Sequence, residues 1–254
     1  MSDSLHVFMF DQIAVRGALV QLDASWRHIR SLRSHPTVVE HLLGECLVSS
    51  ALLASTLKSG SENVLLQIQG SGPINLMVAE CSSDLGLRCT ARYAESLPDG
   101  NLITLLGDGR CAITVSSVSN ARRYQGIVPL DEPTMGGVLE SYMARSEQLE
   151  TRILLFVSSN AASGLLLQRI PERTDSDPDG WNRVSHLAAT ISADELRSLA
   201  APMLLRRLFP FDDVRLFGGR TLRFQCSCST ERVGGMLKGL GRAEIDSILS
   251  QVTA

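Results

Sequence analysis

Apolar positions with helical spacing follow Pro36 and predict a long, mostly buried helix. They recur every three or four positions and cover a wide arc, as in a helix that lies in a core: Val38, Val39, Leu42, Leu43, Cys46, Leu47, Leu53, Ala54 and Leu57. Thr37 and Glu40 have the spacing of a capping box, which marks a helix start. We therefore predict a helix over residues 37–58.

Apolar residues then alternate with polar ones at period two, a pattern that is typical of β-strands. The segments 64–68 and 74–78 each have such an apolar face, and the turn Gly70–Pro73 between them predicts a hairpin. Residues 87–93 alternate in the manner of a half-buried antiparallel strand. The other predicted elements of this region are a helix over 135–148 and strands over 103–106, 111–118, 123–128, 152–157 and 165–170.

The composition changes at Glu172–Gly180, an acidic segment rich in turn residues, and this change predicts a boundary. The segments beyond the boundary have helical character. Ser192 and Glu195 form a second capping box, and Pro202 begins a short helix that extends to residue 209. After it we predict a short strand and a final helix, residues 214–217 and 243–250.

Composition and charge narrow the class of protein. The 254 residues are 44% hydrophobic and 20% charged, which is typical of a folded chain of one large domain or two small ones. Such a chain buries roughly 70–75% of its unfolded surface and needs no disulfide to hold a core. The net charge of −3 argues against nucleic-acid binding. The sequence has no transmembrane stretch or secretory signal, so we expect a cytoplasmic protein whose six cysteines form no disulfide framework.

Nucleotide sites and histidine chemistry find no support in the sequence. The only lysines, Lys58 and Lys238, lack the glycine spacing of a P-loop. Gly107–Ala112 matches the dinucleotide pattern G-x-G-x-x-A, but a β-branched run follows where a helix is needed, so we predict a hairpin turn and no cofactor. His41 lies five residues before Cys46, too far for a nucleophile pair on one helix turn. The other histidines lack metal-ligand spacing and are interpreted as surface or capping residues: His6, His28, His35 and His186.

Cys226 and Cys228 form a C-x-C pair, the strongest chemical signal in the chain. Two thiolates one residue apart can both bind a soft cation such as zinc, but they supply only half of a tetrahedral site. No Cys or His follows residue 228, and the alternative interpretation is two ordinary thiols in a turn. We expect Cys81, in a polar turn, to be exposed, and the remaining cysteines to be small buried hydrophobes: Cys46, Cys89 and Cys111.

Six stretches spread along the chain carry a resemblance to a known family. They are Val15–Val20, Leu52–Lys58, Gln67–Ile74, Arg123–Val128, Arg145–Leu149 and Phe224–Arg232. In content and order they resemble the redox-regulated heat-shock holdases, the 33-kDa chaperonin family, from near residue 5 to residue 249. Several stretches in register are far more specific than any single motif.

The resemblance implies an ATP-independent chaperone, in agreement with the missing P-loop. In the family, a C-x-C and a later C-x-x-C bind one zinc in the reduced, inactive state. Oxidants convert these cysteines to disulfides and release the zinc, and the small zinc domain and the helical linker before it unfold. Unfolding uncovers apolar surface that binds client proteins, and the active form is associated with dimers. Physical chemistry explains this behaviour of the family. Metal binding supplies folding free energy to so small a domain, and thiolates near a cation are readily oxidised.

By position, Cys226 and Cys228 match the first cysteine pair of the family, as zinc ligands and redox-active thiols. The sequence ends about where the C-x-x-C would begin, so we expect either a truncated chain or a homologue without the distal pair, and the abrupt end favours truncation. We expect the C-x-C alone to hold no zinc tightly. We also expect a loosened linker that binds clients without oxidation. A homodimer is expected as well, and exchange of the C-terminal segment between copies is one way to form it.

These inferences combine into one prediction of fold and organisation. The fold class is α+β, with an antiparallel-sheet N-terminal domain and packed helices, then a helical linker region and a short C-terminal redox tail. The corresponding ranges are an N-terminal core domain, 1–175, a linker region, 176–224, and a partial zinc and redox domain, 225–254.

The predicted function is a redox-regulated holdase that binds unfolding proteins under oxidative stress and is not an enzyme. We expect no nucleic-acid or membrane partner. The alternative is a thiol–disulfide oxidoreductase that uses Cys226 and Cys228, although it would lack a C-x-x-C at a helix start; a metal-sensing regulator is a third, disfavoured by the charge balance. The candidate client contacts form an apolar stripe of the linker, a pattern that more commonly packs in a core: Leu196, Leu199, Met203, Leu204 and Leu208.

Overall fold

The computed structural model describes residues 3–57, 62–117, 123–171, 177–226, 230–242 and 244–246. By the contacts within it, the chain forms two compact units, Met1–Phe224 and Gln225–Ala254. The first unit contains the β-sheets. The second contains α8, Thr230–Leu240, an amphipathic helix.

Sheet A of the first unit has the strand order β10–β1–β2–β9–β8, with β11 also paired to β1, and its pairs are antiparallel. The central strands β2 and β9 are buried along almost their whole length, which their nearly continuous apolar runs anticipate. The strands are β1 (Ser4–Phe10), β2 (Val15–Leu22), β8 (Thr151–Val157), β9 (Ala162–Arg169), β10 (Val214–Leu216) and β11 (Arg220–Thr221).

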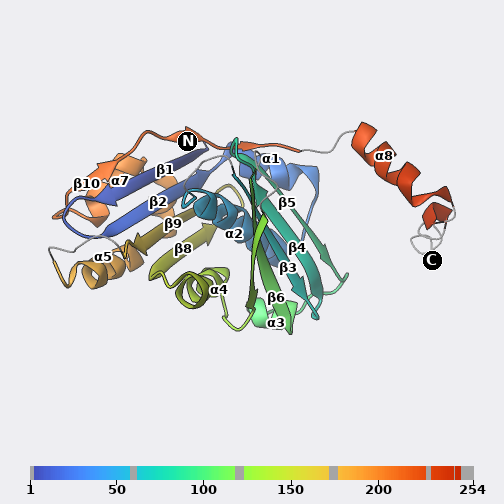
Figure 1. Ribbon diagram of the computed structural model, residues 1–254, viewed down its shortest axis with the longest axis horizontal. Helices are drawn as coiled ribbons and strands as arrows, with labels where there is room; N and C mark the ends of the chain where they lie inside the picture. The colour runs from blue at the N-terminus through green and yellow to red at the C-terminus, as the bar shows by residue number, and fades with distance from the viewer. Residues whose placement is uncertain are drawn as a thin grey trace. The chain divides into compact units, whose positions relative to one another are not determined.

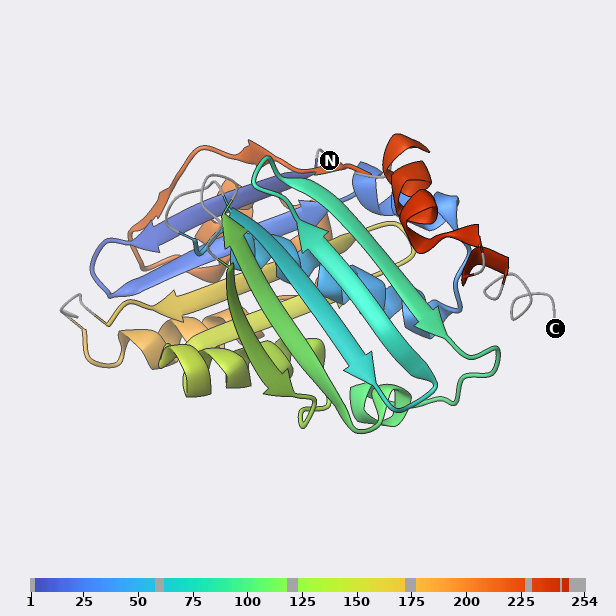
Figure 2. The same ribbon diagram turned by 45° about the vertical axis from the view of Figure 1, so that its right-hand side comes forward.

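Sheet B has the order β12–β5–β4–β3–β6–β7, antiparallel except for the parallel pair β12–β5. Figure 2 shows its long strands side by side. Buried and less buried residues alternate along β3, so one face of this sheet lies in the core. The strands are β3 (Glu62–Gly70), β4 (Ile74–Cys81), β5 (Gly86–Tyr93), β6 (Gly109–Ser117), β7 (Arg123–Pro129) and β12 (Arg223–Phe224).

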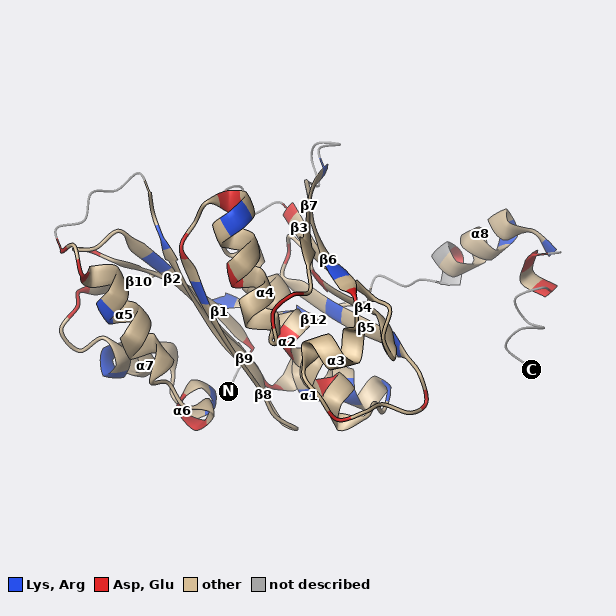
Figure 3. Ribbon diagram, turned by 90° about the horizontal axis from the view of Figure 1, so that it is seen from below, with Lys and Arg blue, Asp and Glu red and all other residues tan. Residues whose placement is uncertain are grey.

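Helices and sheets of the first unit alternate in layers (Figure 1). Helix α2, Thr37–Ala54, lies between the sheets and contacts strands of both. Seen from below, α5, α6 and α7 cover one face of sheet A, α2 and α4 lie against the other, and sheet B closes the stack (Figure 3). The remaining bounds are α1 (Ala24–Leu32), α3 (Leu102–Leu106), α4 (Met135–Tyr142), the π-helix η1 (Met143–Glu147), α5 (Gly180–Ala189), α6 (Ala193–Ser198) and α7 (Ala201–Leu208).

Helix α2 is long and apolar enough to cross a membrane by length and composition, but 67% of this segment is buried inside the fold. Its residues belong to the hydrophobic core between the two sheets. The helix is therefore explained as a core helix, whose apolar character on all sides follows from contact with a sheet on each side.

The predicted α+β class with antiparallel sheets is confirmed, and the structure corrects several details. Helix 37–58 is present as α2 but ends at Ala54, and its predicted capping box is wrong, because Pro36 is the N-cap and no side chain caps the helix. The capping box at Ser192 is confirmed. The predicted helix 135–148 is α4 followed by η1.

The predicted strand 103–106 is wrong, since these residues lie in helix α3. Asn101 accepts a hydrogen bond from the Thr104 backbone N–H and so caps this helix, and Gly107, at φ 62°, ends it. The glycine-rich segment after it is therefore a helix-to-strand turn rather than a hairpin turn, and strand β6 follows it. Most of the predicted helix 243–250 lies outside the described residues, and the three-part division of the chain stays a prediction.

Candidate functional site

Helices α5, α6 and α7 bury an apolar face of sheet A. Aromatic and aliphatic side chains of β1, β2 and β9 form the sheet side of this interface: Phe8, Phe10, Leu19, Leu165 and Leu167. The helix side and its C-terminal loop contribute Val184, Ala188, Leu196, Leu204, Leu205, Leu208 and Phe209. The rings of Phe10 and Phe209 meet edge to face with centroids 5.0 Å apart. We call this layer the linker interface; its non-directional packing needs no specific polar partner.

The predicted client-contacting stripe lies mostly in this interface. Leu196, Leu204 and Leu208 are buried, and Leu199 packs against them as a partly buried residue. Met203 differs, since 62% of it is exposed. The four leucines of the stripe therefore pack against sheet A in this conformation, and most of their apolar surface becomes available only if the helices leave the sheet.

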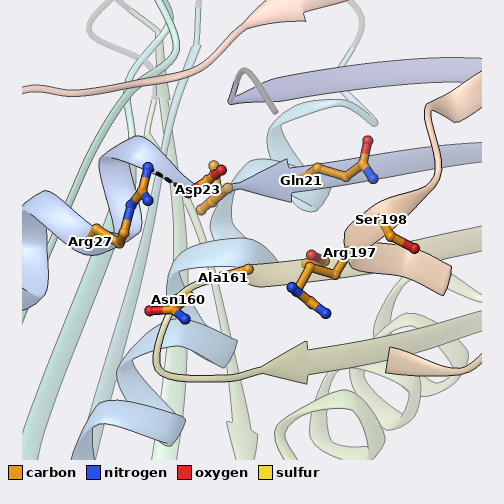
Figure 4. A pocket seen from close by; sticks show the side chains of 9 residues that line it. Gln21, Asp23, Arg27, Asn160, Ala161, Arg197 and Ser198 are labelled. Carbon is orange, nitrogen blue, oxygen red and sulfur yellow. Dashed lines mark ion pairs between the residues drawn. The ribbon is translucent and has the colours of Figure 1, made fainter. Parts of the chain in front are cut away.

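A buried amide anchors α6 to sheet A. Gln21 at the end of β2 donates hydrogen bonds from Nε2 to the Leu196 carbonyl (2.6 Å) and to the Leu199 carbonyl (3.0 Å). A polar cavity of about 400 Å³ opens beside it, where Arg27 and Arg197 also line the wall (Figure 4). Because the helix-end carbonyls would otherwise lack partners, this contact favours the packed linker.

Ion pairs join the linker helices to one another and to the adjacent loops. Arg183 of α5 pairs with Asp212 at 2.6 Å and also with Asp177, and the hydrogen bond from Arg183 lowers the pKa of the Asp177 carboxyl. Glu195 pairs with Arg207, and its pKa is lowered by the hydrogen bond from the Ser192 backbone. Partly exposed pairs such as Arg183–Asp177 and Glu195–Arg207 contribute little stability each, so the apolar layer carries most of the attachment.

Residues 214–224 form a strap that crosses from sheet A to sheet B. β10 and β11 pair with β1, whereas β12 pairs with β5. The Phe224 backbone N–H donates to Ser25 Oγ at 2.9 Å, and the Phe224 ring lies 4.8 Å from the His28 ring. Leu222 is buried and Arg223 pairs with Asp84. The strap thus fixes the chain just before the cysteine tail.

Of the two predicted site cysteines, the structure describes one. Cys226 is exposed, and Cys228 lies outside the described residues. Within the described ranges, no group of three or more His, Cys, Asp or Glu side chains could hold a metal ion. Two thiolates would supply half of the four ligands that zinc requires. The predictions that the pair reacts with oxidants and that it holds no zinc tightly stay predictions.

The other described cysteines lie in the first unit, and their thiols are expected to react slowly. Burial raises the pKa of Cys81, Cys89 and Cys111 to about 12, and that of Cys46 well above its usual value. The predicted exposure of Cys81 is wrong, because its position at the end of β4, opposite Val64 and Leu87, directs it into the core. Since the thiolate is the reactive form, these four thiols are poor redox sensors.

Comparisons with known proteins point to one family. The family model described as Hsp33 protein matches residues 3–253. The "33 kDa chaperonin" of Methylobacillus flagellatus is 42% identical over 252 residues, which cover 99% of this chain and 86% of the relative. That of Chromobacterium violaceum is 41% identical, with 97% and 84% of the two chains covered. Among solved structures, the 33 kDa chaperonin of Thermotoga maritima matches with a TM-score of 0.79 at 20% identity and covers 98% of this chain and 89% of its own, so the fold is shared.

Proposed function

The chain belongs to the Hsp33 family of heat-shock chaperones, and from this premise we propose that it is an ATP-independent holdase whose client site is the linker interface. The observation that carries the proposal is the continuous apolar layer between α5–α7 and sheet A. Its aromatic and aliphatic side chains are separated from solvent only by short helices. A surface of this kind, once uncovered, binds unfolded chains without sequence specificity.

The energetics support release of the helices rather than unfolding of the whole unit. Each fully buried Leu or Phe contributes roughly 1.5–3 kcal/mol, so a short helix that buries few such residues opens more easily than the core between the sheets. Helix α7 buries Ala201, Leu204, Leu205 and Leu208. Helix α2 buries twelve residues against both sheets. Local opening therefore exposes the linker interface first and leaves the two-sheet core folded.

Redox control of this opening is the family's property, and the cysteine pair is where it would act. The family pattern places Cys226 and Cys228 immediately after the strap that ends at Phe224. Within these 254 residues the C-x-C supplies two thiolates, half of the ligands that zinc requires, so we expect little support from a metal for the tail or, through the strap, for the linker. We expect client binding without prior oxidation.

Aggregation assays test the proposed function directly. Light scattering of thermally unfolded luciferase is measured with the 254-residue protein, without nucleotide, before and after treatment with peroxide. We expect suppression of aggregation in both states. Suppression only after peroxide would contradict oxidation-independent binding, and no suppression in either state would contradict the holdase assignment for this chain.

A thiol–disulfide oxidoreductase is the second candidate, and the exposed Cys226 is the observation that favours it. The double variant Cys226→Ser, Cys228→Ser separates the two functions. We expect it to retain suppression of aggregation, and we expect neither protein to reduce insulin disulfides with turnover. Turnover that is lost in the double variant would establish the oxidoreductase instead.

The proposed setting is the cytoplasm, with unfolded proteins as clients and a second copy of the chain as partner. Helix α8 supports a homodimer, since its exposed apolar residues follow helical spacing: Val233, Met236, Leu237 and Leu240. Exchange of the C-terminal segment between copies would bury them. Figure 3 shows basic and acidic residues interspersed along the ribbon, which supports neither a nucleic-acid nor an anionic membrane partner. Sedimentation that shows only monomer would contradict the dimer.

A further inference from the structure

A second cavity lies away from the linker interface, at the C-terminal end of α2. Its volume is about 460 Å³, and both sheets, α4 and η1 contribute to its wall. Cavities of this size hold small molecules. Most of the lining is apolar: Leu53, Leu57, Val64, Ile113, Val115, Met143 and Leu149.

A guanidinium without a carboxylate partner lines this cavity. Arg16 of β2 donates from Nε and Nη2 to Gln168 Oε1, at 3.0 and 2.5 Å, and from Nη1 to the Thr56 carbonyl at 3.4 Å. Both acceptors are neutral, and none of the described carboxylates forms an ion pair with Arg16. Arg16 is partly buried, and because burial disfavours the charged form of a side chain, it lowers the pKa of this guanidinium. An anionic group in the cavity would relieve this cost.

A carboxylate without a donor lines the same cavity. Glu62 Oε2 at the start of β3 is buried and has no hydrogen-bond partner within the described part of the chain. The other carboxylate of the wall, on Glu147, accepts hydrogen bonds from the hydroxyls of Tyr142 (2.7 Å) and Tyr124 (3.0 Å). Glu62 and Arg16 therefore present opposite charges to one apolar space without neutralising each other.

The local backbone conformation and the family-like stretches of the sequence both indicate that this cavity has a function. η1 is a π-helix, a rare form that is frequent at functional sites, and it positions Met143 and Glu147 in the wall. Four of the six stretches that carry the family resemblance reach the cavity. They contribute Arg16, Leu53, Thr56, Leu57, Tyr124, Glu147 and Leu149. The linker interface does not explain why these stretches meet here.

We propose that the cavity binds a small zwitterion of the amino-acid class, with its carboxylate on Arg16, its ammonium on Glu62 and an apolar body on the floor. Such a ligand gives each unpaired charge a partner at once, in a partly desolvated place where charge-assisted hydrogen bonds are strong. A ligand with a single charge would pair with either Arg16 or Glu62. The other group would stay partly desolvated without a partner, which costs binding free energy. The cavity shares no described lining residue with the linker interface.

Binding assays with defined probes test the proposal on the 254-residue protein. L-leucine carries adjacent charges, and 6-aminohexanoate carries charges separated by an alkyl chain. Hexanoate and hexylamine are the singly charged analogues. We expect at least one zwitterion to bind by calorimetry and to raise the Tm, and both analogues to bind about tenfold or more weakly. The proposal is overturned if neither zwitterion binds or if an analogue binds equally well.

Matched charge-neutral variants locate the binding. We expect Glu62→Gln and Arg16→Gln each to weaken zwitterion binding about tenfold or more, because each removes one charged partner. The controls Glu95→Gln and Arg92→Gln change exposed residues outside the cavity and should bind normally. If circular dichroism shows that Arg16→Gln does not fold, Glu62→Gln decides alone, since Glu62 lies half-exposed at a strand start. Unchanged binding in Glu62→Gln would overturn the proposal.

Discussion

At the scale of single residues, burial separates the cysteines into two chemical kinds. Cys46, Cys81, Cys89 and Cys111 act as small apolar side chains of the core, whereas Cys226 is exposed after the strap. The sequence predicted burial for Cys46, Cys89 and Cys111, because they lie on apolar faces of a helix or strand. Cys46 and Cys111 are buried, and Cys89 packs against the core as a partly buried residue. The sequence misplaced Cys81, because the register that turns this strand-end residue inward depends on pairing with distant strands.

The cysteine contrast predicts selective alkylation. At pH 7 a thiol with a pKa of about 12 has almost no thiolate, so Cys81, Cys89 and Cys111 should react with iodoacetamide orders of magnitude more slowly than Cys226. Mass spectrometry of peptides after a short pulse measures this. Denaturant should remove the difference. Equal labelling of core cysteines in the folded protein would show that burial does not control their reactivity.

At the scale of elements, two helices show which structural features follow from the local sequence and which from packing. The wide apolar arc of α2 sufficed to predict a buried helix, and its position between two sheets explains why. The short α3 escaped prediction because its apolar residues also suit a strand. What decides its conformation is the Asn101 cap and the backbone at Gly107. The linker stripe was visible as a pattern, but only packing shows that it faces sheet A.

Neighbouring residues of α7 offer a matched pair for the linker interface. Leu204 is buried and Met203 is 62% exposed. We expect Leu204→Ala to lose about 2–5 kcal/mol of packing, to open the linker and to suppress client aggregation at lower temperature. Met203→Ala should change stability by less than about 0.5 kcal/mol. Denaturant melts and light scattering report both effects. Identical behaviour of the two variants would argue against release of α7.

Helix α2 also makes a prediction about pH. Burial raises the pKa of Glu45 from 4.5 to about 7, and His41 Nδ1 lies 3.6 Å from Glu45 Oε1. Burial lowers the pKa of His41, so this ring offers little positive charge at neutral pH. Because the folded state binds the Glu45 proton more tightly, its stability should fall as pH rises from 4.5 to 7.

Glu45→Gln tests this pH effect. The variant cannot ionise, so it should be more stable than the unaltered protein above pH 7, by on the order of 2–3 kcal/mol, and similar to it at pH 4.5. Urea unfolding across this range measures the difference. The exposed Glu95→Gln is the control, with no change expected. A constant difference at all pH values would indicate a packing effect of the substitution instead.

At the scale of the whole molecule, the arrangement suits a protein that must expose apolar surface without unfolding. The helix between the sheets holds the core, while α5–α7 form an outer layer attached by apolar packing and a buried amide. The sequence predicted the antiparallel sheets and the helical segments beyond the acidic boundary. It could not predict the cavity at Arg16 and Glu62, because residues of β2 and β3 meet there only through tertiary structure.

Hydrogen–deuterium exchange of the client-bound protein tests the central claim most directly, namely that α5–α7 leave sheet A to hold a client. The exchange of residues 180–209 is compared with that of α2 and β3, with and without bound unfolded luciferase. We predict that client binding removes protection from α5–α7 and leaves α2 and β3 protected. Unchanged protection of α5–α7 while a client is held would contradict the account, because the linker interface would then still be closed.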